Sequence, residues 1–273
     1  MGFGEILDET FRFYRRNFWL LVLLALAPQL PALIVEIGSG QASQFGVLGG
    51  LIGSLGNPSA PQQASALPSI NIGLVVAGYL VSLVLFPFSI GLVPRAGVDL
   101  AFGQPTGFRA VVLGVLRRYW ALLGTSVLYV LVSLLALTCI LLPLSLWLLV
   151  RWAVAVPVLL AERAGPRQAL SRSWQLTHDS WWRTFGILLV VLLIQYAASS
   201  ALSVIGLPIA VLVPFIPPIV RGTIVVTTST LASALVTPIW QLCFVLIYLD
   251  LRVRKEHLDL WQLADQANAA ALA

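Results

Sequence analysis

Long apolar runs, almost free of charge, dominate the hydrophobic pattern of this chain. Six of them can be delimited, at 18–37, 71–94, 119–138, 142–160, 184–204 and 226–249. Each run holds about 20 residues, enough to cross roughly 30 Å of hydrocarbon as a helix, whereas strands of soluble proteins are much shorter. The pattern therefore predicts an all-α, polytopic helical membrane protein with about six transmembrane helices.

Shorter stripes of helical periodicity precede three of these runs. Apolar residues share one helical face in the stripe Phe3, Ile6, Leu7, Thr10, Phe11 and Tyr14, in the stripe Phe108, Val111, Val112, Val115, Leu116 and Tyr119, and in the weaker stripe Ala169, Leu170, Ser173, Trp174 and Thr177. Each stripe leads into its run through a basic or aromatic junction, "RRNFWLL" at 15–21, "RRYWALL" at 117–123 or "SWWRTFGILL" at 180–189. We therefore expect three amphipathic helices in the cytoplasmic interface of the membrane.

This order suggests three repeats, each an interfacial helix followed by an out-and-back pair of spans. The repeats would cover about 1–103, 104–164 and 165–256 of a single integral membrane domain, 1–256, followed by a polar, Ala-rich tail at 257–273. Two explanations stay open. The repeats are related copies, or the junctions look alike because any helix that enters the inner leaflet favours Arg beside Trp or Tyr.

Composition and charge agree with a membrane protein and set its orientation. Of the residues, 59% are hydrophobic and 10% charged, and the formal net charge is +5. With six spans and a cytoplasmic N-terminus, fourteen of the sixteen cations fall on cytoplasmic segments. This distribution predicts a multi-pass protein of the bacterial inner (cytoplasmic) membrane with both termini in the cytoplasm. The cations lie in short groups between apolar runs, so we expect anionic lipid headgroups as their partners and no nucleic acid.

A seventh apolar segment, 205–220, complicates this topology. It contains Pro208, Pro214, Pro217 and Pro218, and counting it as a span would place the cytoplasmic-type tail "DLRVRKEH" outside. We therefore interpret it as an external broken or re-entrant segment.

The junctions supply one set of candidate functional residues. Arg side chains near lipid phosphates and Trp side chains at headgroup depth predict a lipid-interface site. Its members are Arg15, Arg16, Trp19, Arg117, Arg118, Trp120, Arg167, Arg172, Trp174, Trp181, Trp182 and Arg183.

A second set of candidate residues lies inside the spans. Counted at about 1.5 Å per residue, Gln29, Arg151, Gln195 and Gln241 share a depth near the middle of the bilayer. On a structural interpretation, Arg151 is a buried hub that donates hydrogen bonds to the glutamine carbonyls and thereby fixes helix packing. A functional interpretation makes this mid-membrane polar layer the lining of a cavity for a small solute or a lipid headgroup.

Three stretches resemble a known family. They are the beginning "GFGEILDETFRFYRRNFWLL", the central "ERAGPRQALSRSWQLTHDSWWRTFGILL" and the ending "LIYLDLRVRKEHLDL". The central match rests on Glu162, Gly165, Pro166, Ala169, Leu170, Arg172, Ser173, Trp174 and Leu176, and the last on Tyr248, Asp250, Leu251, Arg252, Arg254 and Glu256. They resemble the bacterial glycerophosphoryl diester phosphodiesterase membrane-domain family and its YciC-type integral membrane relatives.

The resemblance implies a membrane domain and not the phosphodiesterase itself. In some members this region is joined to a separate soluble barrel with a histidine and carboxylate cluster around a metal, and we expect no such domain here. His178 and Asp179 are adjacent on a helix, so their side chains are expected to point apart and to form a polar link. We therefore expect no catalytic residues, no metal site and no cofactor.

Three classes of function remain, in descending order of support. The first is a non-enzymatic membrane protein that organises or binds lipid, or docks a partner, through its cytoplasmic Arg and Trp surface. The second is a channel or transporter that uses the polar layer around Arg151. The third is a membrane-embedded enzyme. A protein partner and a homo-oligomer are both left open.

Overall fold

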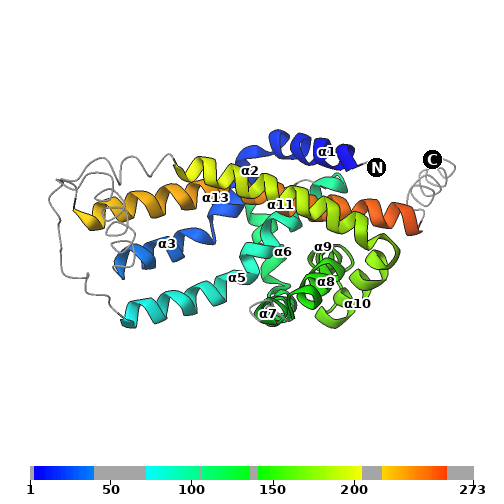
Figure 1. Cartoon of the computed structure of the whole chain (residues 1–273), viewed down its shortest axis with the longest axis horizontal. Helices are drawn as coiled ribbons and strands as arrows, with labels where there is room; N and C mark the ends of the chain where they lie inside the picture. Colours follow the sequence, from blue (N-terminus) through cyan, green and yellow to red (C-terminus); the bar gives the residue numbers. More distant parts are fainter. Residues whose placement is uncertain (1–2, 40–71, 105, 136–140, 205–216, 257–273) are drawn as a thin grey trace. The chain divides into compact units, whose positions relative to one another are not determined.

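Helices account for the regular secondary structure of the protein. The computed structural model describes residues 3–39, 72–104, 106–135, 141–204 and 217–256, and within these ranges it contains no strand (Figure 1). The helices are α1 (Phe3–Arg16), α2 (Phe18–Leu26), α3 (Gln29–Gly38), α5 (Ile72–Ala101), α6 (Phe108–Leu116), α7 (Tyr119–Leu135), α8 (Leu142–Trp152), α9 (Ala155–Ala161), α10 (Pro166–Thr177), the 3-10 turn η2 (His178–Ser180), α11 (Trp181–Val204) and α13 (Pro218–Glu256). The predicted all-α fold is confirmed.

The number of possible membrane spans agrees with the hydrophobic runs. Four helical segments of the described chain are long and apolar enough to cross a membrane, namely Ile72–Ala101, Leu142–Ala161, Pro166–Leu202 and Ile219–Glu256. Two bent pairs, α2 with α3 and α6 with α7, raise the number to six. Each predicted run falls on one of these segments. The loop 38–70, the segment 205–220 and the tail 257–273 lie wholly or mostly outside the described residues.

Prolines explain two of the breaks in the runs. Between α2 and α3 the axis bends by 43°, next to Pro28. Between α8 and α9 the break falls at 153–154, four residues before Pro157. Proline has no N–H to donate, and its ring clashes with the carbonyl four residues earlier, so a helix kinks or stops there. The runs at 18–37 and 142–160 are therefore broken helices and not straight ones.

The described chain forms two compact units. Unit 1 consists of residues 1–17, 90–191 and 239–273, and unit 2 of residues 18–89 and 192–238. The long helices α5, α11 and α13 each contribute residues to both units. This division differs from the three sequence repeats, which stay a prediction.

The core of unit 1 surrounds α9. Every residue from Ala155 to Leu160 is buried, and α10 packs against α9, α8 and α7 (Figure 1). The C-terminal parts of α5 and α13 also approach closely, because a Cβ atom at Gly97 would lie 2.9 Å from Leu242 Cδ2. A similar approach joins α7 to α10, where a Cβ atom at Gly124 would lie 3.0 Å from Pro166 Cγ. Glycine at these two positions thus allows the helices of the core to approach each other closely.

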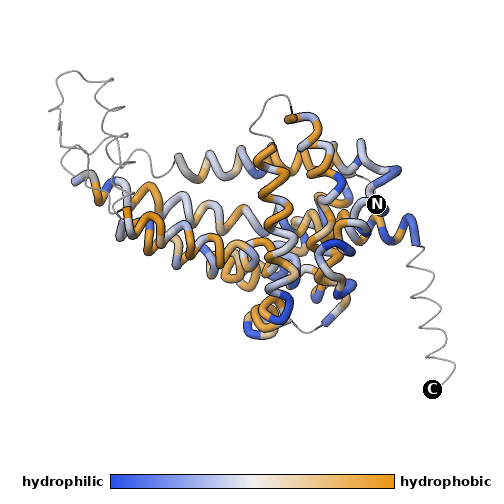
Figure 2. Tube along the Cα trace, turned by 90° about the horizontal axis from the view of Figure 1, so that it is seen from below, coloured by the Kyte–Doolittle hydropathy of each residue, from blue (hydrophilic) through white to orange (hydrophobic). Residues whose placement is uncertain are grey.

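Unit 2 presents apolar surface. Helix α3 meets α13 through a hydrogen bond from Ser233 Oγ to Gln29 Oε1 (2.6 Å), and it meets α5 where Val35 covers Gly78. Outward side chains such as Tyr79 and Tyr196 are 71% and 76% exposed. Hydrophobic residues predominate along these helices (Figure 2). Such a surface is suited to lipid, since apolar patches of this extent are rare on soluble monomers.

Candidate functional site

Three of the helices begin with a pair of adjacent aromatic residues. The rings meet edge to face in Phe18–Trp19 (centroids 5.3 Å apart, planes at 78°), Tyr119–Trp120 (5.4 Å, 78°) and Trp181–Trp182 (4.7 Å, 89°). The second residue of each pair is 75%, 79% and 78% exposed. Three indole rings therefore lie at the surface in one recurring local geometry, at the start of α2, α7 and α11.

Burial around these junctions recurs in the same register. Counted from the first aromatic residue, positions −8 and −4 are buried in all three, at Thr10 and Tyr14, Val111 and Val115, and Ser173 and Thr177. Positions +3 and +6 are buried too, at Leu21 and Leu24, Leu122 and Thr125, and Thr184 and Ile187. The stripes of α1, α6 and α10 therefore bury at least two residues each within the protein, where periodicity alone predicted a face turned to the membrane.

Seven of the twelve predicted lipid-interface residues are exposed. Besides the three indole rings, they are Arg15, Arg16, Arg117 and Arg167. None of these four arginines forms an ion pair within the described ranges, although Arg12 beside them pairs with Glu9. We call these seven residues the Arg/Trp surface. They are exposed and thus accessible to the lipid contacts that the sequence predicts for the site.

The other five predicted interface residues make contacts inside unit 1. Arg118 Nη1 donates to the carbonyl of Arg163 (2.7 Å), and Arg172 and Arg183 form ion pairs with acids. Trp174 packs edge to face on Trp147, and Trp181 Nε1 donates to the Trp147 carbonyl (3.4 Å). Sequence position alone could not separate these five from the exposed seven, because both groups occupy the same junctions.

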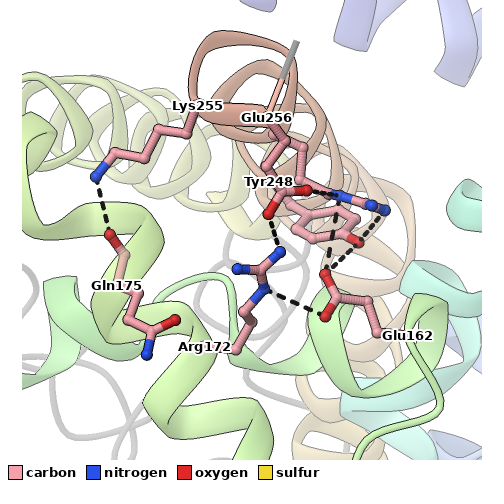
Figure 3. Close-up of polar contacts among 7 residues, drawn as sticks. Glu162, Arg172, Gln175, Tyr248, Lys255 and Glu256 are labelled. Carbon is pink, nitrogen blue, oxygen red and sulfur yellow. Dashed lines mark hydrogen bonds and ion pairs between the residues drawn. The ribbon is translucent and has the colours of Figure 1, made fainter. Parts of the chain in front are cut away.

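A charged cluster joins the end of α9 to α10 and α13 (Figure 3). Arg172 pairs with Glu256, and its Nε lies 3.3 Å from Glu162 Oε2. From α13, Arg252 Nε donates to Glu256 Oε2 (2.9 Å) and Tyr248 Oη donates to Glu162 Oε1 (3.1 Å). The cluster therefore fastens three helices whose residues are up to 86 positions apart in sequence.

Asp250 forms a second ionic contact on α13. Its side chain is only 3% exposed, and it accepts from Arg183 Nη1 of α11 (2.6 Å) and from Arg254 Nε (3.0 Å to Oδ2). Two guanidinium groups therefore compensate one buried carboxylate, which is the condition under which a buried charge is tolerated.

The turn from α9 to α10 is surrounded by cations. Arg163 adopts a φ of 55°, and Arg95 Nη1 donates to the Leu160 carbonyl (3.2 Å) while pairing with Asp99 (2.9 Å). Positive side chains at the last carbonyls of a helix satisfy acceptors that have no intrahelical donor and oppose the negative end of the helix dipole. Several arginines that the sequence assigns to cytoplasmic segments thus stabilise the fold itself.

Arg151, the charged member of the predicted polar layer, lies in the last turn of α8 and is 8% exposed. Its Cζ lies 5.4 Å from the Trp147 ring centroid and 5.2 Å from that of Trp174. Nε and Nη1 are buried and have no hydrogen-bond partner among the described residues. Its carbonyl accepts from Ser173 Oγ (2.8 Å) and Thr177 Oγ1 (3.1 Å), which ties α8 to α10. The guanidinium therefore lies against two aromatic rings, and no described acid forms an ion pair with it.

The three glutamines of the predicted layer are divided between the units. Gln29 and Gln195 belong to unit 2, whereas Arg151 and Gln241 belong to unit 1. Gln29 accepts from Ser233, and its Nε2 donates to the Ala25 carbonyl (2.8 Å). The shared layer therefore stays a prediction.

His178 and Asp179 do meet, unlike the expectation from their adjacency. His178 Nδ1 lies 2.9 Å from Asp179 Oδ1 within the 3-10 turn η2. Both side chains are well exposed, at 64% and 72%, and Lys255 Nζ also binds Asp179 (2.8 Å). No group of three or more His, Cys, Asp or Glu side chains within the described ranges is arranged to hold a metal ion.

Comparison with known families identifies the central and C-terminal part of the chain. The family model for the membrane domain of glycerophosphoryl diester phosphodiesterase matches residues 122–268, more than half of the 273. The chain belongs to this family. No curated protein and no solved structure matches it.

The charged cluster lies within the range that the family model matches. The matched range runs from within α7 to beyond α13 and includes Glu162, Arg172, Tyr248, Asp250 and Glu256. The charged residues and the tyrosine that carry the resemblance in sequence pair with one another in unit 1. The family is that of a membrane domain, so the chain is a multi-pass integral membrane protein, as its apolar helices also indicate.

Proposed function

We propose that the chain is a non-enzymatic integral membrane protein that binds and organises anionic lipid, or docks a partner, at its cytoplasmic face through the Arg/Trp surface. The observation that supports this is the recurrence of an exposed indole at the start of α2, α7 and α11. Indole rings prefer the membrane–water interface, where an apolar body and a polar N–H are both accommodated.

Charge complements these rings. Arg15, Arg16, Arg117 and Arg167 are exposed and form no ion pair within the described chain, so they can reach lipid phosphates. Each basic residue near an anionic membrane surface contributes about 1 kcal/mol, which corresponds to roughly a fivefold change in affinity. Arg172 and Arg183 are engaged with acids and contribute less.

Internal repetition would explain why the surface has three similar parts. The recurring register of burial and ring geometry supports the interpretation that 1–103, 104–164 and 165–256 are related repeats. In that case the three junctions present equivalent anchors to the inner leaflet.

The non-enzymatic assignment rests on the described side chains and on the family. The His178–Asp179 contact is exposed, and Asp179 binds Lys255 through its other oxygen. A general base also needs a substrate group held within hydrogen-bond reach, so a surface pair of this kind does not by itself support catalysis. The matched family is a membrane domain.

A lipid-retention measurement tests the Arg/Trp surface. Arg15, Arg16, Arg117 and Arg167 are replaced together by Gln, and anionic phospholipid bound to the purified protein is counted by native mass spectrometry at low and high salt. We expect the variant to lose most of the salt-sensitive anionic lipid and to keep its melting temperature. Arg12→Gln is the matched control, because this exposed arginine is already paired with Glu9. Equal retention by the fourfold variant and the parent would reject the proposal.

Transport of a small solute or lipid headgroup is the second candidate. The specific observation in its favour is Arg151, a buried cation without an acceptor in a candidate span. Anion flux into proteoliposomes that Arg151→Gln abolishes, with the melting temperature unchanged, would favour this candidate over the first.

A further inference from the structure

The free-energy cost of burying the Arg151 guanidinium is only partly compensated by its described neighbours. Burying a guanidinium is strongly unfavourable unless acceptors replace its water, and two buried nitrogens here have no acceptor among the described residues. The two indole rings stabilise the charge through cation–π contacts, which are weaker than the hydration that is lost. The aromatic contacts therefore offset only part of the cost, and an anion is the partner that would remove the rest.

Five acids of unit 1 are already paired with other cations. Glu162 and Glu256 pair with Arg172 and Arg252, and Asp250 pairs with Arg183 and Arg254. Asp99 pairs with Arg95, and Asp179 with Lys255. None of these five carboxylates forms an ion pair with Arg151 in the described structure, and a bound anion would supply the missing counter-charge.

The position of Arg151 indicates where such an anion would come from. The carbonyls of Trp147 and Arg151 are bonded to Trp181 and to Ser173 and Thr177, which sets this turn of α8 level with the start of α11. If the exposed Trp182 marks headgroup depth, as the proposed function holds, Arg151 lies within about one helical turn, ~5 Å, of that depth. Counting residues along one straight span predicts a place near mid-bilayer instead. On the present proposal the buried helix α9 extends the run beyond the membrane edge.

We propose that Arg151, Trp147 and Trp174 form a binding site for one phosphate group. A phosphodiester spreads a single negative charge over two free oxygens, which matches one guanidinium with unpaired donors on two nitrogens. Trp147 is 36% exposed, so its ring forms the side of the site from which a ligand can approach. The phosphate belongs to a lipid headgroup or to a soluble phosphate ester, and the site holds either by the same chemistry.

The depth argument rests on the proposed function, but the site is tested separately from it. The full-length protein is washed at about 1 M salt, where the Debye length falls to about 3 Å and surface attraction is screened. Phosphorus retained per chain is then measured, and the retained molecule is identified by mass spectrometry. In a second arm, delipidated protein is titrated with dimethyl phosphate and its melting temperature is followed. Arg151→Gln and Arg151→Lys are compared with the parent and with Arg12→Gln, an exposed arginine that is paired with Glu9 and lies outside the Arg/Trp surface.

We expect the parent and Arg12→Gln to retain about one phosphate group per chain at high salt, Arg151→Gln to lose it, and Arg151→Lys to lose part of it. A retained phospholipid identifies the lipid source, whereas a thermal shift with dimethyl phosphate and no retained lipid identifies a soluble ester. Retention that is unchanged in folded Arg151→Gln overturns the site. If Arg151→Gln does not fold, the parent and Arg151→Lys decide. A parent that retains no phosphorus and shows no thermal shift overturns the site. A parent that retains phosphorus or shows a shift, with weaker binding by Arg151→Lys, supports the site. Loss of salt-sensitive lipid in the fourfold Arg/Trp variant reports on the proposed function and leaves this result unaffected.

Discussion

Asp250 and Arg151 show two ways in which one unit accommodates a buried charge. Asp250 is compensated by two arginines of its own chain, and one of them, Arg183, lies 67 positions away in sequence. Arg151 is compensated only by aromatic rings. The sequence identified both residues, Asp250 as part of the family resemblance and Arg151 as an unusual charge in an apolar run. It could not give their partners, because pairing between α10, α11 and α13 depends on how the helices pack.

The contribution of Asp250 can be measured by removing its charge. Asp250→Asn keeps the shape but removes the carboxylate charge that Arg183 and Arg254 bind, and Arg183 is 30% exposed. Breaking a buried pair costs about 3–5 kcal/mol, and solvent access to both arginines reduces this to about 2 kcal/mol. We expect a melting temperature lowered by about 4–8 °C in detergent.

Glu9→Gln is the matched control for this measurement. Its partner Arg12 is 76% exposed, so the melting temperature should stay within about 2 °C of the parent. Equal shifts in the two variants would mean that burial of Asp250 does not strengthen its ion pairs.

At the scale of the element, hydrophobic runs located the helices but not their surroundings. The run at 142–160 falls on one candidate span, Leu142–Ala161, but the helix is interrupted before α9, and every residue from Ala155 to Leu160 is buried. Pro157 signals the break in the sequence. Full burial has no such signal, because an apolar helix inside a protein and one facing lipid have the same composition. The same ambiguity affects the stripes of α1, α6 and α10, which are partly covered by protein.

Close approach of α5 and α13 gives a prediction at this scale. Gly97→Val would bring its side chain onto Leu242 and Val245, whose nearest atoms lie 2.9 and 3.3 Å from a Cβ placed there. Overpacking of a buried contact costs about 1–3 kcal/mol, so the melting temperature should fall by several degrees. Gly186→Val in α11 is the matched control, since a Cβ atom there meets nothing within 4 Å. A Gly97 variant as stable as the Gly186 variant would show that the α5–α13 contact is loose.

At the scale of the molecule, composition and charge predicted the class correctly and left the organisation open. An all-α membrane protein with four to six spans and its family follow from the apolar runs and a few motifs. The division into two compact units does not follow from these features, because α5 and α13, continuous helices of 30 and 39 residues, each contribute residues to both units. Helices of about 45 and 58 Å exceed the roughly 30 Å of a hydrocarbon core, so parts of both must lie outside it.

Orientation in the membrane is the last prediction, and it rests on charge. Fourteen of the sixteen cations fall on segments that a six-span chain with a cytoplasmic N-terminus places inside. Translocating so many arginines would be costly, so we expect Gln104, Gln168 and the region 252–256 in the cytoplasm and the loop 38–70 outside. Single cysteines are introduced at Ser59, Gln104, Gln168 and Arg254 after Cys139 and Cys243 are replaced by Ser and Ala. An impermeant maleimide should label position 59 in intact cells and the other three only after permeabilisation. Labelling of position 254 in intact cells would require an odd number of spans, and with it a membrane-crossing role for the proline-rich segment 205–220.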